Sequence, residues 1–247
     1  MKNLSKLAVL GSLLAASASF AFADSISLGS FATNTTAVSL GFSASQTAMN
    51  FAGYTSFAAP PAVASTPTLL SGTANSYTLL ANGVWAAPTG ASTWVGYAAN
   101  AGPGGTDPGY GYYQFTTEFT ALGGTYNGSI DLMADDTAEV LLNGVVIVPF
   151  GALGADTHCA SSPASCSAGD IVNLTGITLL SGPDANMYTF VVEQAGAVGS
   201  GGDPSGVNFT SSFASAVTPE PSTLVLLGTG MLCASGFFFR RRKSLTV

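Results

Sequence analysis

The six basic residues of this chain all lie near its two ends. Lys2 and Lys6 stand at the start, and the run Arg-Arg-Arg-Lys occupies residues 240–243. Between residues 24 and 218 there are twelve acidic residues and no Lys or Arg, so this part has a net charge of about −12. It cannot form Lys or Arg ion pairs, and its fold has to rest on an apolar core and on hydrogen bonds. A surface of this charge repels nucleic acid, which excludes nucleic-acid binding.

The C-terminal end combines three features in order. Residues 218–222 read Thr-Pro-Glu-Pro-Ser, residues 222–239 carry no charge, and the basic run follows. As a helix, the uncharged run would be roughly 27 Å long at about 1.5 Å per residue, just enough to cross a slightly thin hydrocarbon core. The basic residues would stay on the cytoplasmic side, because Arg and Lys are costly to translocate. We therefore expect a transmembrane helix over residues 222–239.

This end of the chain resembles the PEP-CTERM sorting signal, in which a Pro-Glu-Pro triplet precedes a short apolar helix and a basic cluster. That signal is found on exported proteins of Gram-negative bacteria that make extracellular polysaccharide, and its processing enzyme is exosortase. The resemblance implies that residues 218–243 form a sorting segment, handled by exosortase and the secretion machinery. An ordinary C-terminal tail anchor is the alternative. The sorting and processing residues implied are Pro219, Glu220, Pro221, Arg240, Arg241 and Arg242.

The N-terminal end predicts a secretory signal peptide over residues 1–23. Two lysines precede an apolar stretch over residues 7–20, and Ala21-Phe22-Ala23 is a small-x-small cleavage site. Residues 24–217 are then a single exported domain. We expect this domain to cross the inner membrane, to stay anchored there by its C-terminus until processing, and to end in the cell envelope or outside the cell.

Alternating hydrophobicity predicts that the exported domain is all-β. In residues 111–119, the side chains of Tyr113, Phe115 and Phe119 fall on one face, the period of two that marks a half-buried strand. No sustained helical periodicity occurs outside the two ends of the chain. The other segments expected to be strands on the same grounds are residues 25–28, 37–42, 129–134 and 187–193.

A β-hairpin is expected at Asn143-Gly144, which separates the apolar runs at residues 138–142 and 145–148. Both turn residues tolerate the positive φ angles of a type I′ turn. Many short strands with Gly- and Pro-rich connections over this length indicate a β-sandwich of the jelly-roll kind.

A second resemblance agrees with this fold class. An aromatic strand over residues 113–119, the sequence Ala-Asp-Asp-Thr-Ala-Glu-Val-Leu-Leu-Asn-Gly over residues 134–144 and the later segments 186–192 and 202–206 are similar to galactose-binding-like jelly rolls. Such domains are frequent among PEP-CTERM proteins. The resemblance implies the fold rather than any ligand.

Cys159 and Cys166 enclose a short Ala-, Ser- and Pro-containing loop in a chain that is exported to an oxidising compartment. A local disulfide is expected between them. His158 lies beside this loop, but one His and two Cys without a matching pair elsewhere do not indicate zinc.

Four acidic residues are close together in the sequence: Asp131, Asp135, Asp136 and Glu139. Asp135 and Asp136 have three interpretations: turn residues whose side chains cap backbone amides, ligands of a structural calcium ion, or part of a catalytic carboxylate pair. Catalysis has the least support, because no His or Arg helper is near and no nucleophile motif occurs.

Aromatic side chains suggest a surface for stacking sugar rings. Trp85 and Trp94 are better explained as core residues, whereas Tyr110 and Tyr112 are flanked by glycines and are the candidates for exposed glycan contact. The sequence thus predicts an exported, non-enzymatic envelope or matrix protein associated with extracellular polysaccharide. The alternative is a carbohydrate-binding module with a defined glycan ligand.

Overall fold

The computed structural model describes residues 24–43, 45–61, 66–151, 171–196, 203–216 and 229–230. The chain divides into two compact units: Asp24–Ala216, and a second unit made of Met1–Ala23 with Val217–Val247. The first unit contains every β-strand in the described part of the chain.

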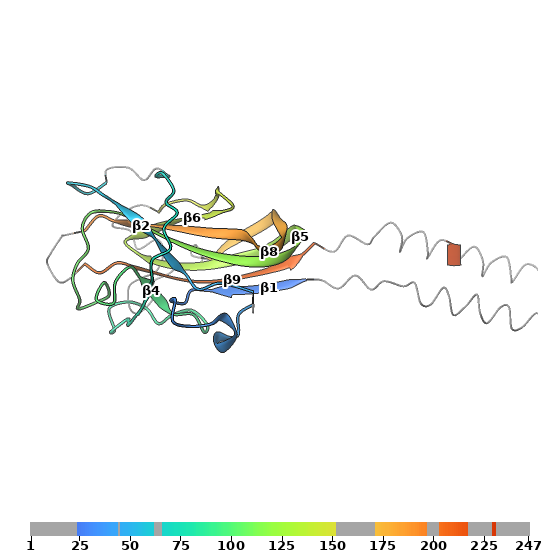
Figure 1. Cartoon of the computed structure of the whole chain (residues 1–247), viewed down its shortest axis with the longest axis horizontal. Helices are drawn as coiled ribbons and strands as arrows, with labels where there is room; N and C mark the ends of the chain where they lie inside the picture. The colour runs from blue at the N-terminus through green and yellow to red at the C-terminus, as the bar shows by residue number, and fades with distance from the viewer. Residues whose placement is uncertain are drawn as a thin grey trace, which may run out of the picture. The chain divides into compact units, whose positions relative to one another are not determined.

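The described residues form nine strands and one short 3₁₀ helix, which confirms the all-β prediction (Figure 1). The elements are β1 (Ser25–Gly29), η1 (Ala37–Leu40), β2 (Asn50–Ser56), β3 (Tyr77–Leu79), β4 (Trp94–Gly96), β5 (Gly111–Asp135), β6 (Thr137–Leu142), β7 (Val145–Val148), β8 (Ile171–Gln194) and β9 (Gly206–Ser215).

All strand pairs are antiparallel and belong to one nine-stranded sheet with the order β3-β4-β9-β5-β8-β6-β7. β1 pairs with β9, and β2 pairs with β5. The first half of β5 lies between β2 and β8, and its second half lies between β8 and β9. In Figure 1, β2 and β6 lie on one side of the long strands and β1 and β4 lie on the other.

β5 changes the face that it turns to the core midway along its length. Its buried core side chains are at odd positions up to Ala121 and at even positions from Tyr126 onward. Between these residues, Gly123 and Gly124 have φ angles of 81° and 116°, which residues other than glycine rarely adopt. Side chains from both halves belong to the same hydrophobic cluster, so the sheet encloses one core in the manner of a β-sandwich.

The main core is aromatic. Phe115, Phe190 and Phe209 are at most 1% exposed, and the rings of Phe190 and Phe209 stack at 4.5 Å between centroids. A smaller cluster contains Trp85 and Trp94, whose rings stack at 4.3 Å and which are 2% and 0% exposed. The prediction that both tryptophans are core residues is confirmed.

The Asn143-Gly144 hairpin is confirmed. The two residues have φ angles of 51° and 80° and join β6 to β7. Asn143 also accepts a hydrogen bond from the backbone N–H of Met187 and donates one to Asn186 Oδ1, which attaches the turn to β8. The strands expected over residues 25–28, 111–119, 129–134 and 187–193 are likewise present, although β5 and β8 are much longer than the patterns that predicted them.

The prediction of a strand over residues 37–42 is wrong. Ala37–Leu40 forms the 3₁₀ helix η1, which ends at Gly41 with a φ angle of 77°. Beyond this turn, Phe42 stacks on Phe31 and lies so close to Gly29 that any side chain at position 29 would overlap its ring. Ala37 is buried and Phe42 packs beside β1, whereas Val38 is 66% exposed, and the segment does not extend the sheet.

Among the residues that the structure describes, no helix is long and apolar enough to cross a membrane. The expected signal peptide over residues 1–23 lies outside the described residues. So does the expected helix over residues 222–239, apart from the helical Thr229 and Gly230.

Candidate functional site

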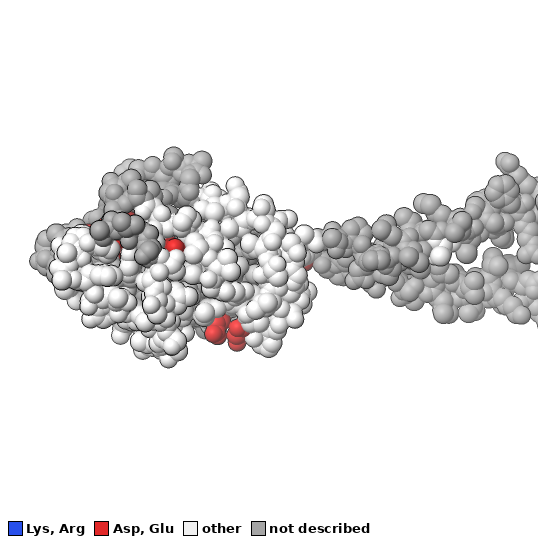
Figure 2. Space-filling model, turned by 90° about the horizontal axis from the view of Figure 1, so that it is seen from above, with Lys and Arg blue, Asp and Glu red and all other residues white. Residues whose placement is uncertain are grey.

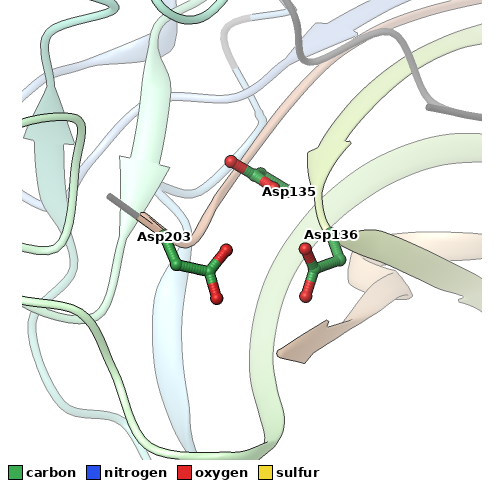
Figure 3. A group of neighbouring side chains, drawn as sticks. All are labelled: Asp135, Asp136 and Asp203. Atoms are coloured by element: carbon green, nitrogen blue, oxygen red, sulfur yellow. The ribbon is translucent and has the colours of Figure 1, made fainter. Parts of the chain in front are cut away.

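Three aspartates from two segments of the chain meet at one end of the strands. Asp135 is the last residue of β5, Asp136 precedes β6, and Asp203 lies three residues before β9. One carboxylate oxygen from each lies within 4.8 Å of the other two, and all three residues are half-buried. Figure 3 shows the carboxylates of Asp136 and Asp203 facing each other, with Asp135 beside them. We call these three residues the acidic cluster.

Asp135 is held by Trp85, whose indole Nε1 donates a hydrogen bond to Asp135 Oδ2 at 2.6 Å. The indole reaches this position because it lies against Gly206, the strand partner of Asp135. A Cβ atom at Gly206 would come within 2.8 Å of the Trp85 ring. The buried tryptophan pair thus fixes one side of the acidic cluster.

Backbone amides fix the other two aspartates. Asp136 Oδ2 accepts a hydrogen bond of 2.7 Å from the N–H of Ala195, just beyond β8. The N–H of Asp203 donates to Asp107 Oδ1 at 3.0 Å. Gly196 lies so close to Asp203 that an added Cβ would overlap the Asp203 carboxylate. The cluster therefore depends on the chain returning past the end of β8.

The last two residues of β8 are polar and fully buried beside the acidic cluster. Gln194 is 0% exposed, and its Nε2 donates to Asp203 Oδ2 at 3.0 Å and to the Asp203 carbonyl at 3.3 Å. Glu193 is also 0% exposed, and the negative charge of Asp136 repels its carboxylate. Within the described part of the chain, Gln194 Oε1 and both carboxylate oxygens of Glu193 have no hydrogen-bond partner. Buried polar atoms in this state are rare in folded proteins.

The acidic groups here hold their protons more tightly than exposed carboxyls do. Burial raises the pKa of Asp135 to about 7, helped by the charges of Asp136 and Asp203 and opposed by the Trp85 hydrogen bond. Burial and the charge of Asp136 also raise the pKa of Glu193 to about 7. Burial raises the pKa of Asp136 despite the amide hydrogen bonds that lower it. Neutralising the negative charge of any of these carboxyl groups therefore stabilises the folded state.

The structure separates the four acids that are close in the sequence. Asp135 and Asp136 lie together, but Asp131 lines a groove elsewhere and Glu139 accepts a hydrogen bond from Thr66 at 3.1 Å. Asp136 does cap a backbone amide, but that amide belongs to Ala195 at the end of another strand. Sequence reasoning missed Asp203, Glu193 and Gln194 as neighbours of the pair.

A groove of about 420 Å³ lies beside β1, β5 and β9. Asp131 contributes a carboxyl group to the lining of this groove, and burial raises its pKa. Hydroxyl groups and one aromatic ring complete much of the lining. Its members include Ser27, Phe42, Ser129, Asp131, Thr210 and Ser212.

The two tyrosines predicted to contact glycans differ in exposure. Tyr110 is half-buried, whereas Tyr112 is only 4% exposed. The Tyr112 ring packs edge-on against Phe57 at 5.3 Å and beside Phe150 at 5.5 Å, so the expected exposure of Tyr112 is wrong. The face of β5 that carries Tyr112 is covered because Gln114 binds the backbone of Thr68 and Leu70 from the loop after β2. Whether Tyr110 contacts a glycan stays a prediction.

Two other sets of predicted residues lie outside the described part of the chain. One is the expected disulfide pair, Cys159 and Cys166. The other is the set of sorting residues, Pro219, Glu220, Pro221, Arg240, Arg241 and Arg242.

The family model described as the PEP-CTERM protein-sorting motif matches residues 217–243. This match supports the interpretation of the C-terminal segment as a sorting signal. It indicates an exported protein that exosortase sorts after transient anchoring by its C-terminus. No curated protein matches the chain.

Proposed function

We propose that the chain is a non-enzymatic protein of the cell envelope or extracellular matrix, associated with extracellular polysaccharide. The observation that carries the proposal is the sorting motif at residues 217–243, which directly follows the compact all-β unit Asp24–Ala216. Charged side chains on that unit are sparse and, with no Lys or Arg, acidic: on the face seen in Figure 2, only a few acidic patches interrupt uncharged residues. Such a surface suits a hydrated matrix of neutral polymer better than an anionic ligand.

We further propose that the unit is a galactose-binding-like jelly roll. The Asn143-Gly144 hairpin, the aromatic first half of β5 and the inward Tyr188, Phe190 and Val192 of β8 occur as that resemblance expects. The enclosed core, lined by both halves of β5, is compatible with this fold.

Processing provides the first test. In a host with exosortase, the mature protein is expected to lack residues 240–243 and to end near Pro219 to Pro221. Replacing Glu220 by Ala should leave an uncleaved, membrane-bound form. The matched control is Glu118→Ala, which removes an exposed acid far from the motif in sequence. Mass spectrometry of secreted protein and membranes would decide, and an intact C-terminal peptide in secreted wild-type protein would contradict the proposal.

Binding of a defined glycan is the second candidate function, and the groove beside β1, β5 and β9 favours it. Its volume is within the range of small-ligand sites, and hydroxyls, a carboxylate and the Phe42 ring can together bind the polar and apolar sides of a sugar. Strands β1, β5 and β9 line one part of the groove, and the end of η1 with Phe42 and the loop residues Gly90 and Ala91 line the rest.

A glycan array with the full chain in detergent tests this candidate. If the groove binds a sugar, Asp131→Asn should weaken binding of a glycan hit by roughly 10- to 100-fold, since hydrogen bonds to charged groups contribute on the order of 1.5–3 kcal/mol. Glu118→Gln is the control and should leave binding unchanged. A hit that survives Asp131→Asn would place recognition elsewhere, and an array without hits would favour the matrix role alone.

A further inference from the structure

The acidic cluster gathers negative charge that the exported part of the chain cannot neutralise by itself. Asp135, Asp136 and Asp203 bring three carboxylates together, and residues 24–218 contain no Lys or Arg. The hydrogen bonds from Trp85 and Ala195 each satisfy one oxygen but supply no positive charge. Partly buried carboxylates of this kind are stable only when they are protonated or paired with a cation.

Gln194 gives an independent indication of what the cluster binds. This side chain is 0% exposed, its amide group lies against the Asp203 carboxylate, and its Oε1 has no partner among the described residues. The two ends of an amide have nearly the same shape, and their assignment follows from the hydrogen bonds around them. With a cation in the cluster, the amide turned by 180° would present its oxygen to the ion, in place of the two hydrogen bonds that its nitrogen now donates to Asp203. The ion would then partner the amide oxygen and neutralise the three carboxylates, and the NH₂ group would occupy the place where Oε1 now lies.

The spacing of the oxygens suits calcium. Ca²⁺ binds oxygen ligands at about 2.3–2.6 Å, so two oxygens on one ion are separated by at most about 5 Å, and the three carboxylate oxygens lie within 4.8 Å of one another. Mg²⁺ requires about 2.0–2.1 Å and near-ideal octahedral geometry, which two adjacent aspartates and a third from a distant segment provide less readily. We propose that Asp135, Asp136, Asp203 and the amide oxygen of Gln194 form a calcium-binding site.

Such a site would join three parts of the sheet that the backbone does not connect locally. Asp135 and Asp136 belong to the junction of β5 and β6, Gln194 ends β8, and Asp203 precedes β9. A bound ion therefore stabilises the folded state and not the unfolded chain, so it should raise the melting temperature by a saturable amount. At a hundredfold excess over the dissociation constant, the expected rise is about 5–10 °C for a domain of this size.

Thermal melting of the full chain in detergent tests the site, in chelator, in CaCl₂, and in MgCl₂ or NaCl of equal ionic strength. We expect a saturable rise with calcium, a smaller one with magnesium, and almost none with NaCl. Asp136→Asn and Asp203→Asn should abolish the calcium response, whereas Glu118→Gln, which removes one charge at an exposed position, should keep it. In chelator, both Asn variants should melt at or above the wild-type temperature, because each removes a repelling charge.

Terbium provides a second readout, because Tb³⁺ replaces Ca²⁺ and emits when a nearby tryptophan is excited. Trp85 donates its indole N–H to Asp135, so a metal in the cluster lies next to this ring. Terbium emission should rise on binding, fall on addition of calcium, and be lost in Gly196→Ala. In that variant, the added Cβ displaces the Asp203 carboxylate without removing any acid. A Gly109→Ala control, whose Cβ meets no atom within 4 Å, should bind terbium as the wild type does.

The outcomes separate the calcium site from its alternatives. If the aspartates only cap backbone amides, Asp136→Asn lowers the melting temperature equally in calcium and in chelator. If calcium acts only by screening charge, NaCl at equal ionic strength reproduces its effect and Gly196→Ala behaves as the wild type. Either result overturns the proposal. Loss of the calcium shift and of the terbium signal in the cluster variants, with both retained in Glu118→Gln, establishes it.

Discussion

Two sets of buried polar residues, one around Asn208 of β9 and the other at the end of β8, differ in how completely they are hydrogen-bonded. Asn208 is 0% exposed, yet its Nδ2 donates to Ser30 and Ser92, and its Oδ1 accepts from the N–H and the hydroxyl of Thr89. We call these four residues the Asn208 network. Near the acidic cluster, by contrast, Gln194 and Glu193 keep three buried oxygens without a partner among the described residues.

The difference shows how this chain can bury polar groups without basic residues. Amides and hydroxyls both donate and accept, so a set of them can satisfy itself, as the Asn208 network does. Carboxylates only accept when ionised, and here no Lys or Arg is available to donate. The Asn208 network is therefore complete within the protein, whereas the acidic cluster needs protons or a metal ion. Three substitutions test this contrast.

The largest effect is expected for Asn208→Ala. The variant leaves buried groups of Ser30 and Ser92 and half-buried groups of Thr89 without their partner, which should lower the free energy of unfolding by about 3 kcal/mol. Urea denaturation would measure it. Because the network is complete by itself, the loss should be the same in calcium and in chelator. The control Asn34→Ala, at an exposed position, should change stability by less than about 0.5 kcal/mol. A loss in Asn208→Ala that depends on calcium would contradict the view that this network is complete without a metal ion.

An intermediate effect is expected for Gly206→Ala. The new Cβ lies 2.8 Å from Trp85, which cannot move freely because it stacks on Trp94, so overpacking should cost about 2 kcal/mol. The displaced indole should also lose its hydrogen bond to Asp135 and change its fluorescence. Gly109→Ala is the matched control. Unchanged fluorescence together with unchanged stability would show that Trp85 does not position Asp135.

The smallest effect is expected for Glu193→Gln, and it has the opposite sign. In chelator at pH 8, removing a buried charge without a partner should stabilise the fold by about 1 kcal/mol. The pH dependence follows from the pKa values of Asp135 and Glu193, which are about 7 in the fold against 3.8 and 4.5 ordinarily. Between about pH 4 and pH 7, the folded protein binds more protons than the unfolded chain, so the free energy of unfolding falls as pH rises.

Glu193→Gln should therefore flatten this pH profile, while Glu118→Gln should leave its slope as it is. Denaturation at several pH values in chelator would measure both. A wild-type profile that rises from pH 4 to pH 7 would contradict the assigned protonation states.

Local patterns in the sequence predicted the strands well, because alternation and turn chemistry act over a few residues. The aromatic face of residues 111–119 and the Asn143-Gly144 turn are examples. The patterns failed where distant segments decide. The patterns predict two strands, residues 111–119 and 129–134, yet both belong to β5, because β8 pairs with it on both sides of Gly123-Gly124. Likewise, residues 37–42 alternate weakly, but they contain the 3₁₀ helix η1, and Phe42 packs on Gly29 and Phe31.

The candidate site was predictable only in part for the same reason. Asp135 and Asp136 are adjacent in the sequence and attract attention as a pair. Asp203 and Gln194 join them only because β5 pairs with both β8 and β9, which brings the ends of three strands together. No spacing rule for metal ligands covers residues so far apart. A polar residue at the end of an apolar strand, such as Gln194 after Val191 and Val192, was the one local sign available.

The pairing of β9 has a mechanical consequence for a domain tethered by its C-terminus. β9 runs between β1 and β5, with ladders from Ser25↔Ala214 to Gly29↔Thr210 and from Tyr126↔Ser215 to Asp135↔Gly206. A pull on Ala216 along the strand acts across these hydrogen bonds, which lie perpendicular to it, and loads both ladders in shear at once. Extracting β9 therefore requires many bonds to fail together rather than one after another. β9, which precedes the sorting segment in the chain, is thus held on both sides against a force applied through that segment.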